Sequence, residues 1–243
     1  MHAAVVTSFD APPQYCDYPE PVARGGDEVV AAGLHPRVRS QASGSPDTST
    51  DELPLVPGID GVVRDPKGRI RYTVLDDTVL GTMAERTVID LQRSVVLPDG
   101  IDPVQIAAAM NPVMSSWVAL RRRIDFGRRQ RVLILGATGN AGRMAIQVAK
   151  RFCTTDLARD RLGRRPNGTD PLRGAALRST RLQIVGSGIG SVPGRDFVKE
   201  LPKLVSAVTH GDFDVRARAI PLAEVEHVWT ATAGMSDRIV LVP

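Results

Sequence analysis

Three glycines spaced three residues apart form the part of the sequence whose chemistry is easiest to state. Gly136, Gly139 and Gly142 follow the apolar run 132–135 and precede a stretch of helical composition. In a strand–turn–helix unit such glycines permit a tight turn, let backbone N–H groups approach a pyrophosphate, and let the helix pack closely on the strand. The anion would lie against the positive end of the helix dipole. The pattern predicts a dinucleotide-binding loop.

The chain that must position this loop has the bulk properties of a soluble globular protein. It holds 243 residues, of which 42% are apolar and 24% are charged, enough for one large domain or two modest ones. No apolar run approaches the ~20 residues that cross a bilayer, which excludes a membrane span. The N-terminus lacks a basic segment ahead of an apolar one. It is therefore interpreted as the first strand of a mature protein, and the cytoplasm is the expected location.

Basic residues crowd both sides of the glycine loop, although the net charge of the chain is +4. They are Arg121, Arg122, Arg123, Arg128, Arg129 and Arg131 before it and Lys150, Arg151, Arg159, Arg161, Arg164 and Arg165 after it. A basic surround suits the phosphates of a dinucleotide or of nucleic acid. Solvated arginines on helix faces account for it equally well. No aromatic residue alternates with these arginines after Phe152, so nucleic-acid binding is the weaker interpretation.

The first hundred residues are rich in β-branched runs bounded by Pro and Gly, which indicates a compact β-rich domain. Strands are predicted within 2–8, 27–36, 58–65, 69–77 and 83–98. Residues 40–54 are rich in Ser, Thr, Asp and Pro and are predicted to form a surface loop.

Helical composition begins after Gly100. Residues 102–123 are predicted to form two helices that meet near Asn111 and Pro112, because proline interrupts a helix. A strand is predicted at Val132–Leu135, and the helix after the loop would pack on a parallel sheet through an apolar face. That face comprises Met144, Ile146, Val148 and Ala149. Further elements are a strand at 181–192, helices within 195–211 and 221–235, and a closing strand at 237–243, whereas 151–176 lack periodicity and are expected to be irregular.

Six segments carry a family resemblance through their residues and their order along the chain. They lie at 53–63, 81–89, 114–123, 131–150, 176–192 and 221–243. Together they resemble the medium-chain dehydrogenase/reductase superfamily, specifically its zinc-independent, quinone-oxidoreductase-like branch. The resemblance covers residues 1–152 and about 174–243.

The resemblance implies an α/β fold with two domains. A GroES-like β-barrel domain would comprise 1–108 and be completed by 218–243, and a truncated Rossmann domain with a doubly wound parallel sheet would comprise 109–217. The implied activity is NADPH-dependent reduction of a quinone or of an activated carbonyl or enone by hydride transfer. The cofactor would lie in the cleft between the domains, and the chain would form a homodimer.

The same resemblance assigns site residues by position. Gly136, Ala137, Thr138, Gly139, Asn140, Ala141 and Gly142 would cradle the pyrophosphate, Ser115 matches a hydroxyl residue near the nicotinamide ribose, and Gly186, Ser187 and Gly188 match a strand end near the nicotinamide. His35 and Pro36 stand where the family commonly has Asn-Pro. His35 and Tyr72 are candidate hydrogen-bond donors to a carbonyl of the acceptor. Trp117 is a candidate wall of the site that holds the acceptor. A half-buried strand tyrosine accounts for Tyr72 at least as well.

Zinc is not expected. Zinc-dependent relatives have a Cys after the third strand and a Gly-His-Glu sequence where this chain has Gly58-Ile59-Asp60. The lobe with four Cys that holds structural zinc is absent as well, and Cys16 and Cys153 are the two cysteines of the chain. His35, His210 and His227 are interpreted as surface or core residues rather than ligands.

The segment after Lys150 is too short for a complete dinucleotide domain. Six strands in two βαβαβ halves need well over ~100 residues, whereas about sixty separate Val132 from Val192. The missing part would carry the adenosine ribose-phosphate site. Two explanations are open: a natural, internally deleted paralogue, or a deletion or frameshift in the coding sequence. Two other functions are also open: a non-catalytic dimeric scaffold derived from the family, and nucleic-acid binding supported by charge alone.

Overall fold

The computed structural model describes the chain except residues 22–26, 46–48, 77, 128–131, 133, 135, 153–191 and 232–236. The chain divides into two compact units, one of Met1–Asn111 with Leu201–Pro243 and one of Pro112–Glu200. The domain boundaries inferred from the resemblance stay a prediction. Among the described residues, no helix has both the length and the apolar character that a membrane span needs.

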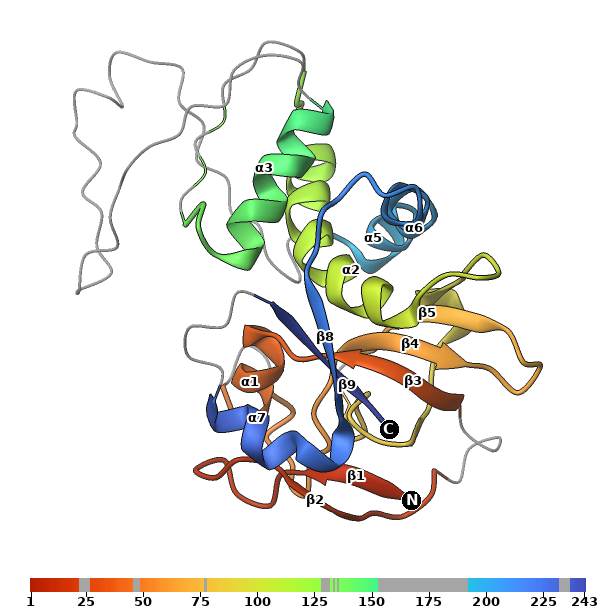
Figure 1. The fold of residues 1–243 in the computed structure, drawn as a ribbon, viewed down its shortest axis with the longest axis vertical. Coiled ribbons are helices and arrows are strands. Elements are labelled where there is room, and N and C mark those ends of the chain that lie inside the picture. The colour runs from red at the N-terminus through yellow and green to blue at the C-terminus, as the bar shows by residue number, and fades with distance from the viewer. Residues whose placement is uncertain are drawn as a thin grey trace. The chain divides into compact units, whose positions relative to one another are not determined.

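Two sheets form the first unit (Figure 1). In the smaller one, β1 (His2–Val5) pairs antiparallel with β2 (Gln14–Asp17). The larger sheet has the order β7-β5-β4-β3-β9-β8, and β6 (Arg86–Thr87) also pairs with β3. Its other strands are β3 (Asp27–Gly33), β4 (Asp60–Arg64), β5 (Ile70–Val74), β7 (Ser94–Val96), β8 (Ala217–Pro221) and β9 (Arg238–Val242). The short helix η1 (Leu91–Arg93) precedes β7.

The last strand of the chain completes the sheet that the N-terminal residues begin. β9 pairs antiparallel with β3 through Gly33 and Val240, and β8 pairs parallel with β9. The strands predicted within the first hundred residues and at the C-terminus are therefore present in the larger and smaller sheets. Short apolar runs with high β-branched content account for them, since such side chains pack well on a pleated surface.

One hydrophobic core joins strands that are far apart in sequence to the C-terminal helix α7 (Val225–Ala231), which follows the short helix η3 (Leu222–Glu224). Its fully buried members include Ala4, Val38, Val56, Val63, Met83, Val225 and Leu241. Each fully buried aliphatic side chain contributes about 1.5–3 kcal/mol to the free energy of unfolding. The helix predicted within 221–235 is confirmed over its described part.

Helix α1 (Pro36–Ala42) departs from the sequence prediction, because the surface loop predicted over 40–54 is wrong at its start. Pro36 occupies the first turn, where proline is tolerated, and His35 precedes it in an extended conformation. Val38, Gln41 and Ala42 are buried, so packing of one helix face overrides the polar composition. The helix lies beside α7 (Figure 1), where Nη2 of Arg39 donates to the carbonyl of Val228 at 3.4 Å.

The prediction of two helices meeting at Asn111 and Pro112 is wrong. Residues Pro103–Val118 form one helix, α2, with Pro112 inside it, and a π-helical turn, η2 (Ala119–Arg123), continues it. Proline inside a helix costs about 3 kcal/mol. Met110 and Val113, on either side of it, are completely buried. Burial of such neighbours offsets the lost hydrogen bond.

The prediction of a single helix within 195–211 is also wrong, because two helices occupy this range. α5 (Gly194–Val198) ends before Lys199, and α6 (Leu201–Thr209) begins with Pro202 in its first turn. Proline is compatible with the first turn of a helix and not with its interior, so it marks a new start here.

The second unit contains α3 (Asn140–Phe152), as predicted after the glycine loop. Met144, Val148 and Ala149 are buried, which confirms most of the expected apolar face, whereas Ile146 is half-buried. α3 includes Arg151 and Phe152, so the irregular segment cannot begin at 151. The rest of that segment and nearly all of the strand predicted at 181–192 lie outside the described residues, as does part of the strand predicted at Val132–Leu135.

Candidate functional site

The glycine loop has the backbone geometry that its sequence predicts. Gly136 has φ +70°, in the left-handed region that favours glycine. Its carbonyl accepts a hydrogen bond from the N–H of Gly139 at 3.0 Å, and the carbonyl of Gly139 accepts one from the N–H of Arg143 at 2.9 Å. The turn therefore closes on itself and leads directly into the first turn of α3.

Gly142 is required by a close approach of two backbone segments. A Cβ at this position would lie 2.1 Å from the carbonyl oxygen of Gly136 and 2.8 Å from Cα of Ala137. A Cβ at Gly139, by contrast, would meet the Gly136 oxygen at an ordinary 3.5 Å. Packing thus demands a glycine at 142 and permits a side chain at 139. The open space next to the backbone at Gly139 would allow an anion to approach the backbone there.

The mouth of α3 is compatible with an anion. Thr138, Gly139 and Ala141 are exposed, and the first turn of the helix carries no acidic residue. The first N–H groups of a helix have no partner within it and attract negative charge. Ser115 lies exposed on α2, whereas Gly186, Ser187 and Gly188 lie outside the described residues. The assignment of these residues to the cofactor site stays a prediction.

In the first unit, His35 and Tyr72 both bind the same buried carboxyl group. Nε2 of His35 lies 2.8 Å from Oδ1 of Asp60, and the hydroxyl of Tyr72 donates to Oδ2 of Asp60 at 2.7 Å. The hydroxyl of Thr82 donates to the backbone carbonyl of Asp60 at 2.8 Å. The exposed fractions of His35, Asp60 and Tyr72 are 2%, 1% and 0%. Three residues from distant segments thus form one network closed to solvent.

The fold explains why these side chains meet. Asp60 is the first residue of β4 and pairs with Val74 of β5, while Tyr72 pairs with Val62. Side chains two residues apart in a strand share a face, so Asp60 and Tyr72 point to the same side of the sheet. His35 follows the end of β3, the other neighbour of β4, and immediately precedes α1.

Burial and charge shift two groups in this region. Burial, followed by the charge of Asp60 and its hydrogen bond, raises the pKa of Tyr72 well above 10, so the phenol keeps its proton. Burial lowers the pKa of the Arg238 guanidinium, which the negative charge of Asp60 partly restores. Arg238 is 8% exposed. The cluster therefore holds a carboxyl group, an imidazole, a neutral phenol and a buried guanidinium.

Asp60 is the functional candidate that sequence reasoning missed. From the sequence it stands out only as the residue that replaces a zinc-ligating Glu, and not as a partner of His35 and Tyr72. One signal could have found it, because a carboxyl group inside the apolar segment 55–63 must find buried donors. The prediction that His35 or Tyr72 donates to a substrate carbonyl stays a prediction.

The described residues hold no group of three or more His, Cys, Asp or Glu side chains that could bind a metal ion. His35 and Asp60 are two side chains of the kind that bind metal ions. The other side chain that contacts the carboxyl group of Asp60 is the phenol of Tyr72. Both oxygens of the Asp60 side chain are already engaged, because Oδ2 accepts from the hydroxyl of Tyr72 and Oδ1 lies within hydrogen-bond distance of Nε2 of His35.

A second buried carboxyl group organises the other unit. Glu200 accepts a hydrogen bond from Nε1 of Trp117 at 2.8 Å and from Nε of Arg121 at 2.7 Å, and its Oε1 lies 2.6 Å from Nη2 of Arg122. Burial opposes its ionisation, but these donors outweigh burial and lower its pKa. The guanidinium of Arg121 also lies over the rings of Trp117 and Phe152. Trp117, the candidate wall, is thus part of a cluster that ties the start of this unit to its end.

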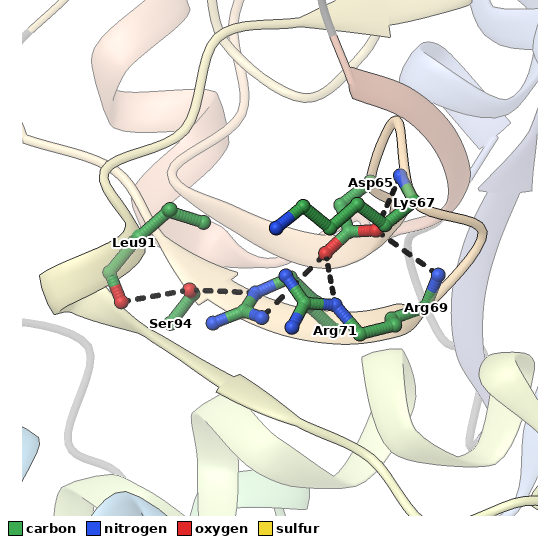
Figure 2. A network of polar contacts seen from close by, with 6 residues as sticks. All are labelled: Asp65, Lys67, Arg69, Arg71, Leu91 and Ser94. Atoms are coloured by element: carbon green, nitrogen blue, oxygen red, sulfur yellow. Dashed lines mark hydrogen bonds and ion pairs between the residues drawn. The ribbon is translucent and has the colours of Figure 1, made fainter.

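A third polar network fixes the turn between β4 and β5 (Figure 2). Oδ1 of Asp65 accepts from the backbone N–H groups of Lys67 and Arg69, and Oδ2 accepts from Nε of Arg69 at 2.8 Å. Nη1 of Arg71 lies 3.6 Å from Oδ2, and Nε of Arg71 donates to the Ser94 hydroxyl. Burial raises the pKa of Asp65, but these donors outweigh it and the net shift is downward. The network orders the strands that carry Asp60 and Tyr72.

Comparison with known proteins supports the resemblance seen in the sequence. No family model matches the chain. The probable NADPH-dependent quinone reductase tdiC of Emericella nidulans is 26% identical in an alignment of 357 residues that covers 100% of both chains. That alignment is longer than the 243 residues of this chain, so the relative has segments with no counterpart here.

Solved structures show the fold. The quinone oxidoreductase of Thermus thermophilus, solved also in complex with NADPH, superimposes with a TM-score of 0.78 and 19% identity, covering 100% of both chains. An alcohol dehydrogenase superfamily protein from Novosphingobium aromaticivorans gives a TM-score of 0.80 at 17% identity, covering 100% of this chain and 99% of that one. The predicted fold class is confirmed, and the chain is similar to a quinone reductase.

Proposed function

We propose that this chain is an NADPH-dependent oxidoreductase that reduces a quinone, or an activated carbonyl or enone, by hydride transfer without zinc. The observation that carries the proposal is the glycine loop, in which Gly136 is left-handed and a Cβ at Gly142 would strike the backbone. The quinone reductase relative and the fold shared with NADPH-binding structures agree with it. We further propose a cytoplasmic homodimer that acts on a small molecule, with no role in nucleic-acid binding.

The residues Gly136 to Gly142 fit a pyrophosphate, because the exposed backbone at Gly139 opens onto the start of α3. Ser115 and Gly186 to Gly188 are proposed to lie along the ribose and nicotinamide. When bound, NADPH supplies the hydride, and the chain has to orient the acceptor and supply a proton. His35 is the proposed contact of the acceptor oxygen, whereas the hydroxyl of Tyr72 already donates its proton to Asp60.

We expect the cofactor to bind weakly, because the chain lacks the segment that would carry the adenosine ribose-phosphate site. Loss of that subsite removes contacts, whereas the pyrophosphate loop is retained. Isothermal titration calorimetry with NADPH measures this directly, and a low-micromolar dissociation constant would contradict weak binding.

The decisive assay follows absorbance at 340 nm with NADPH and a panel of quinones and enones. Turnover supports the oxidoreductase. A stable dimer that neither binds nor oxidises NADPH supports the second candidate, a non-catalytic scaffold derived from this family. Strongly salt-dependent binding to an oligonucleotide would instead point to nucleic acid.

A further inference from the structure

The second unit contains a cavity of about 250 Å³ that is partly open to solvent. Residues of the turn η2, of the segment after it and of the end of α3 line this cavity. They are Leu120, Arg121, Ile124, Asp125, Phe126 and Phe152. Four of these side chains are apolar, and the other two carry opposite charges. Apolar walls with a few polar groups are typical of sites that bind small organic molecules.

The guanidinium of Arg121 is held in one orientation at this cavity. Its Nε donates to Oε2 of Glu200 at 2.7 Å. Its Cζ lies 5.8 Å from the ring centre of Trp117 and 5.6 Å from that of Phe152, within the range of a cation–π contact. The two rings meet edge to face, with their centres 4.8 Å apart. A ligand therefore does not have to order this side chain, which lowers the entropic cost of binding.

Glu200 can orient Arg121 because other donors hold Glu200 in place. Its Oε2 also accepts a hydrogen bond from Nε1 of Trp117 at 2.8 Å, and its Oε1 lies 2.6 Å from Nη2 of Arg122. The side chain of Glu200 is 2% exposed, so little water competes for these contacts. The carboxyl group therefore keeps the guanidinium of Arg121 against the two rings and in the lining of the cavity.

One edge of the Arg121 guanidinium remains available to a ligand. A guanidinium carries N–H donors on all of its nitrogens, and within the part of the chain that the structure describes only Nε of Arg121 makes a hydrogen bond. Nη1 and Nη2 thus present parallel N–H groups, the arrangement that binds a carboxylate through two hydrogen bonds. The side chain is 34% exposed, so a ligand that enters the cavity can reach it.

The charge around the cavity favours an anion as its ligand. Guanidinium groups outnumber carboxyl groups in and beside the lining. The guanidinium groups belong to Arg121, Arg122, Arg123 and Arg151, and the carboxyl groups to Asp125 and Glu200. Asp196 of α5 also interacts with the charge of Arg122, but it is paired with Lys199 at 3.0 Å, and this pair adds no net charge. The resulting positive potential attracts small anions.

We propose that this cavity binds a single-ring aromatic carboxylate, at a site separate from the one proposed for the cofactor. The carboxylate binds Nη1 and Nη2 of Arg121, and the ring packs among Leu120, Ile124 and Phe152. A hydroxyl group on the ring supplies a donor for Asp125, since an ionised carboxyl group only accepts. The volume agrees, because a protein cavity of roughly 150 Å³ holds benzene. The 250 Å³ present here leave room for a carboxylate as well.

The test titrates the full chain with 4-hydroxybenzoate by isothermal titration calorimetry, with and without NADPH. We expect a dissociation constant of about 1 mM or lower. NADPH should not change it, because the described lining residues include none of those proposed to bind the cofactor. Phenol lacks the carboxylate and should bind at least roughly tenfold more weakly.

Three results of these titrations would overturn the proposal. They are no binding of 4-hydroxybenzoate at about 10 mM, equal affinity for phenol, and displacement of 4-hydroxybenzoate by NADPH. Because the two sites are separate, a chain that fails to bind NADPH should still bind 4-hydroxybenzoate. The proposed reductase function and the aromatic carboxylate site are thus tested independently.

Two variants of the lining and a matched control determine where the ligand binds. Arg121→Gln removes the guanidinium and should weaken binding at least roughly tenfold. Ile124→Trp enlarges a half-buried side chain of the lining, so it should fill the cavity and abolish binding while Arg121 stays in place. Arg195→Gln alters an exposed arginine of α5 outside the lining and should bind as the parent does. Thermal unfolding of each variant shows whether the fold is retained.

A methyl resonance gives a second readout, which does not depend on Arg121→Gln being folded. In the ¹³C-methyl spectrum of the parent, the signals of Ile124 are identified by their absence in Ile124→Trp. The ring current of a bound aromatic ligand should shift these signals as 4-hydroxybenzoate is added. Signals that stay in place at saturation, or unchanged affinity in a folded Ile124→Trp, would mean that the ligand binds elsewhere and would overturn the proposed site.

Discussion

The hydroxyl of Tyr72 lies 2.7 Å from Oδ2 of Asp60, and both side chains are almost completely removed from solvent. The bond connects neighbouring strands β4 and β5 on the face of the sheet that also receives His35. A buried carboxyl group needs such donors, because its desolvation is costly when they are absent. The contact therefore stabilises the fold whether or not the chain turns over a substrate.

Tyr72→Phe tests that contribution. The substitution removes one donor from Asp60 and keeps the ring, so we expect the free energy of unfolding to fall by about 1–3 kcal/mol. For a chain of this size each 1 kcal/mol corresponds to a Tm shift of roughly 2–4 °C. Urea unfolding followed by circular dichroism measures the change. Stability equal to that of the parent would mean that the bond makes no net contribution.

Sequence reasoning succeeded where one local pattern determines one local geometry. The glycines at 136 and 142 have the left-handed φ and the close backbone approach that their spacing predicts. The strands around Asp60 and Tyr72 follow from β-branched runs between turn residues. In these cases the determining contacts lie within a few residues of each other.

Sequence reasoning failed where contacts between residues that are distant in the sequence determine the local structure. α1 forms from a polar segment because Val38 and Gln41 are buried, and Gln41 accepts a hydrogen bond from the backbone N–H of Gly58. Pro112 stays inside α2 because its apolar neighbours are buried. The network joins Asp60 to residues up to 25 positions away, which no local pattern reveals.

A neighbouring position on β5 should respond in the opposite direction to Tyr72. The hydroxyl of Thr73 is buried and has no hydrogen-bond partner in the part of the chain that the structure describes. Replacing it with the nearly isosteric Val removes a polar group that lost its hydration on folding. We expect Thr73→Val to stabilise the chain by about 1 kcal/mol, measured by the same urea titration. A destabilised variant would indicate that the hydroxyl is satisfied after all.

Two aspartates should give opposite dependences of stability on pH. Hydrogen bonds to Arg69 and Lys67 outweigh burial and lower the pKa of Asp65, so its contribution is present above the usual value of 3.8 and is lost as pH falls through its folded pKa. Burial, aided by the charge of Asp65, raises the pKa of Asp27 despite a hydrogen bond from Ile89. Its contribution is present below 3.8 and is lost as pH rises through its folded pKa.

We therefore expect Asp65→Asn to lower Tm by a few degrees at pH 7, and Asp27→Asn to raise it slightly. The difference for Asp27→Asn should shrink as pH falls through the raised pKa of Asp27 toward 3.8, and the difference for Asp65→Asn should shrink only below 3.8, as pH falls toward the lowered pKa of Asp65. Differential scanning calorimetry between pH 3 and pH 7 gives the curves of the parent and the two variants. Parallel curves for parent and variants would show that neither carboxyl group differs between the folded and unfolded states.

The loop at the start of α3 allows a structural turn to be separated from a cofactor site. A methyl group at 142 would lie 2.1 Å from the backbone oxygen of Gly136, so Gly142→Ala should destabilise its unit by about 1–3 kcal/mol and abolish NADPH binding together with the turn. Gly139→Ala adds a methyl group at an ordinary 3.5 Å and should leave Tm unchanged. If the exposed backbone at 139 receives a pyrophosphate, that same methyl group obstructs the approach, and calorimetry should show NADPH affinity reduced roughly tenfold or more, a loss of about 1.4 kcal/mol. Equal NADPH affinity in Gly139→Ala and the parent would leave the glycines as elements of a turn, with cofactor binding elsewhere or lost.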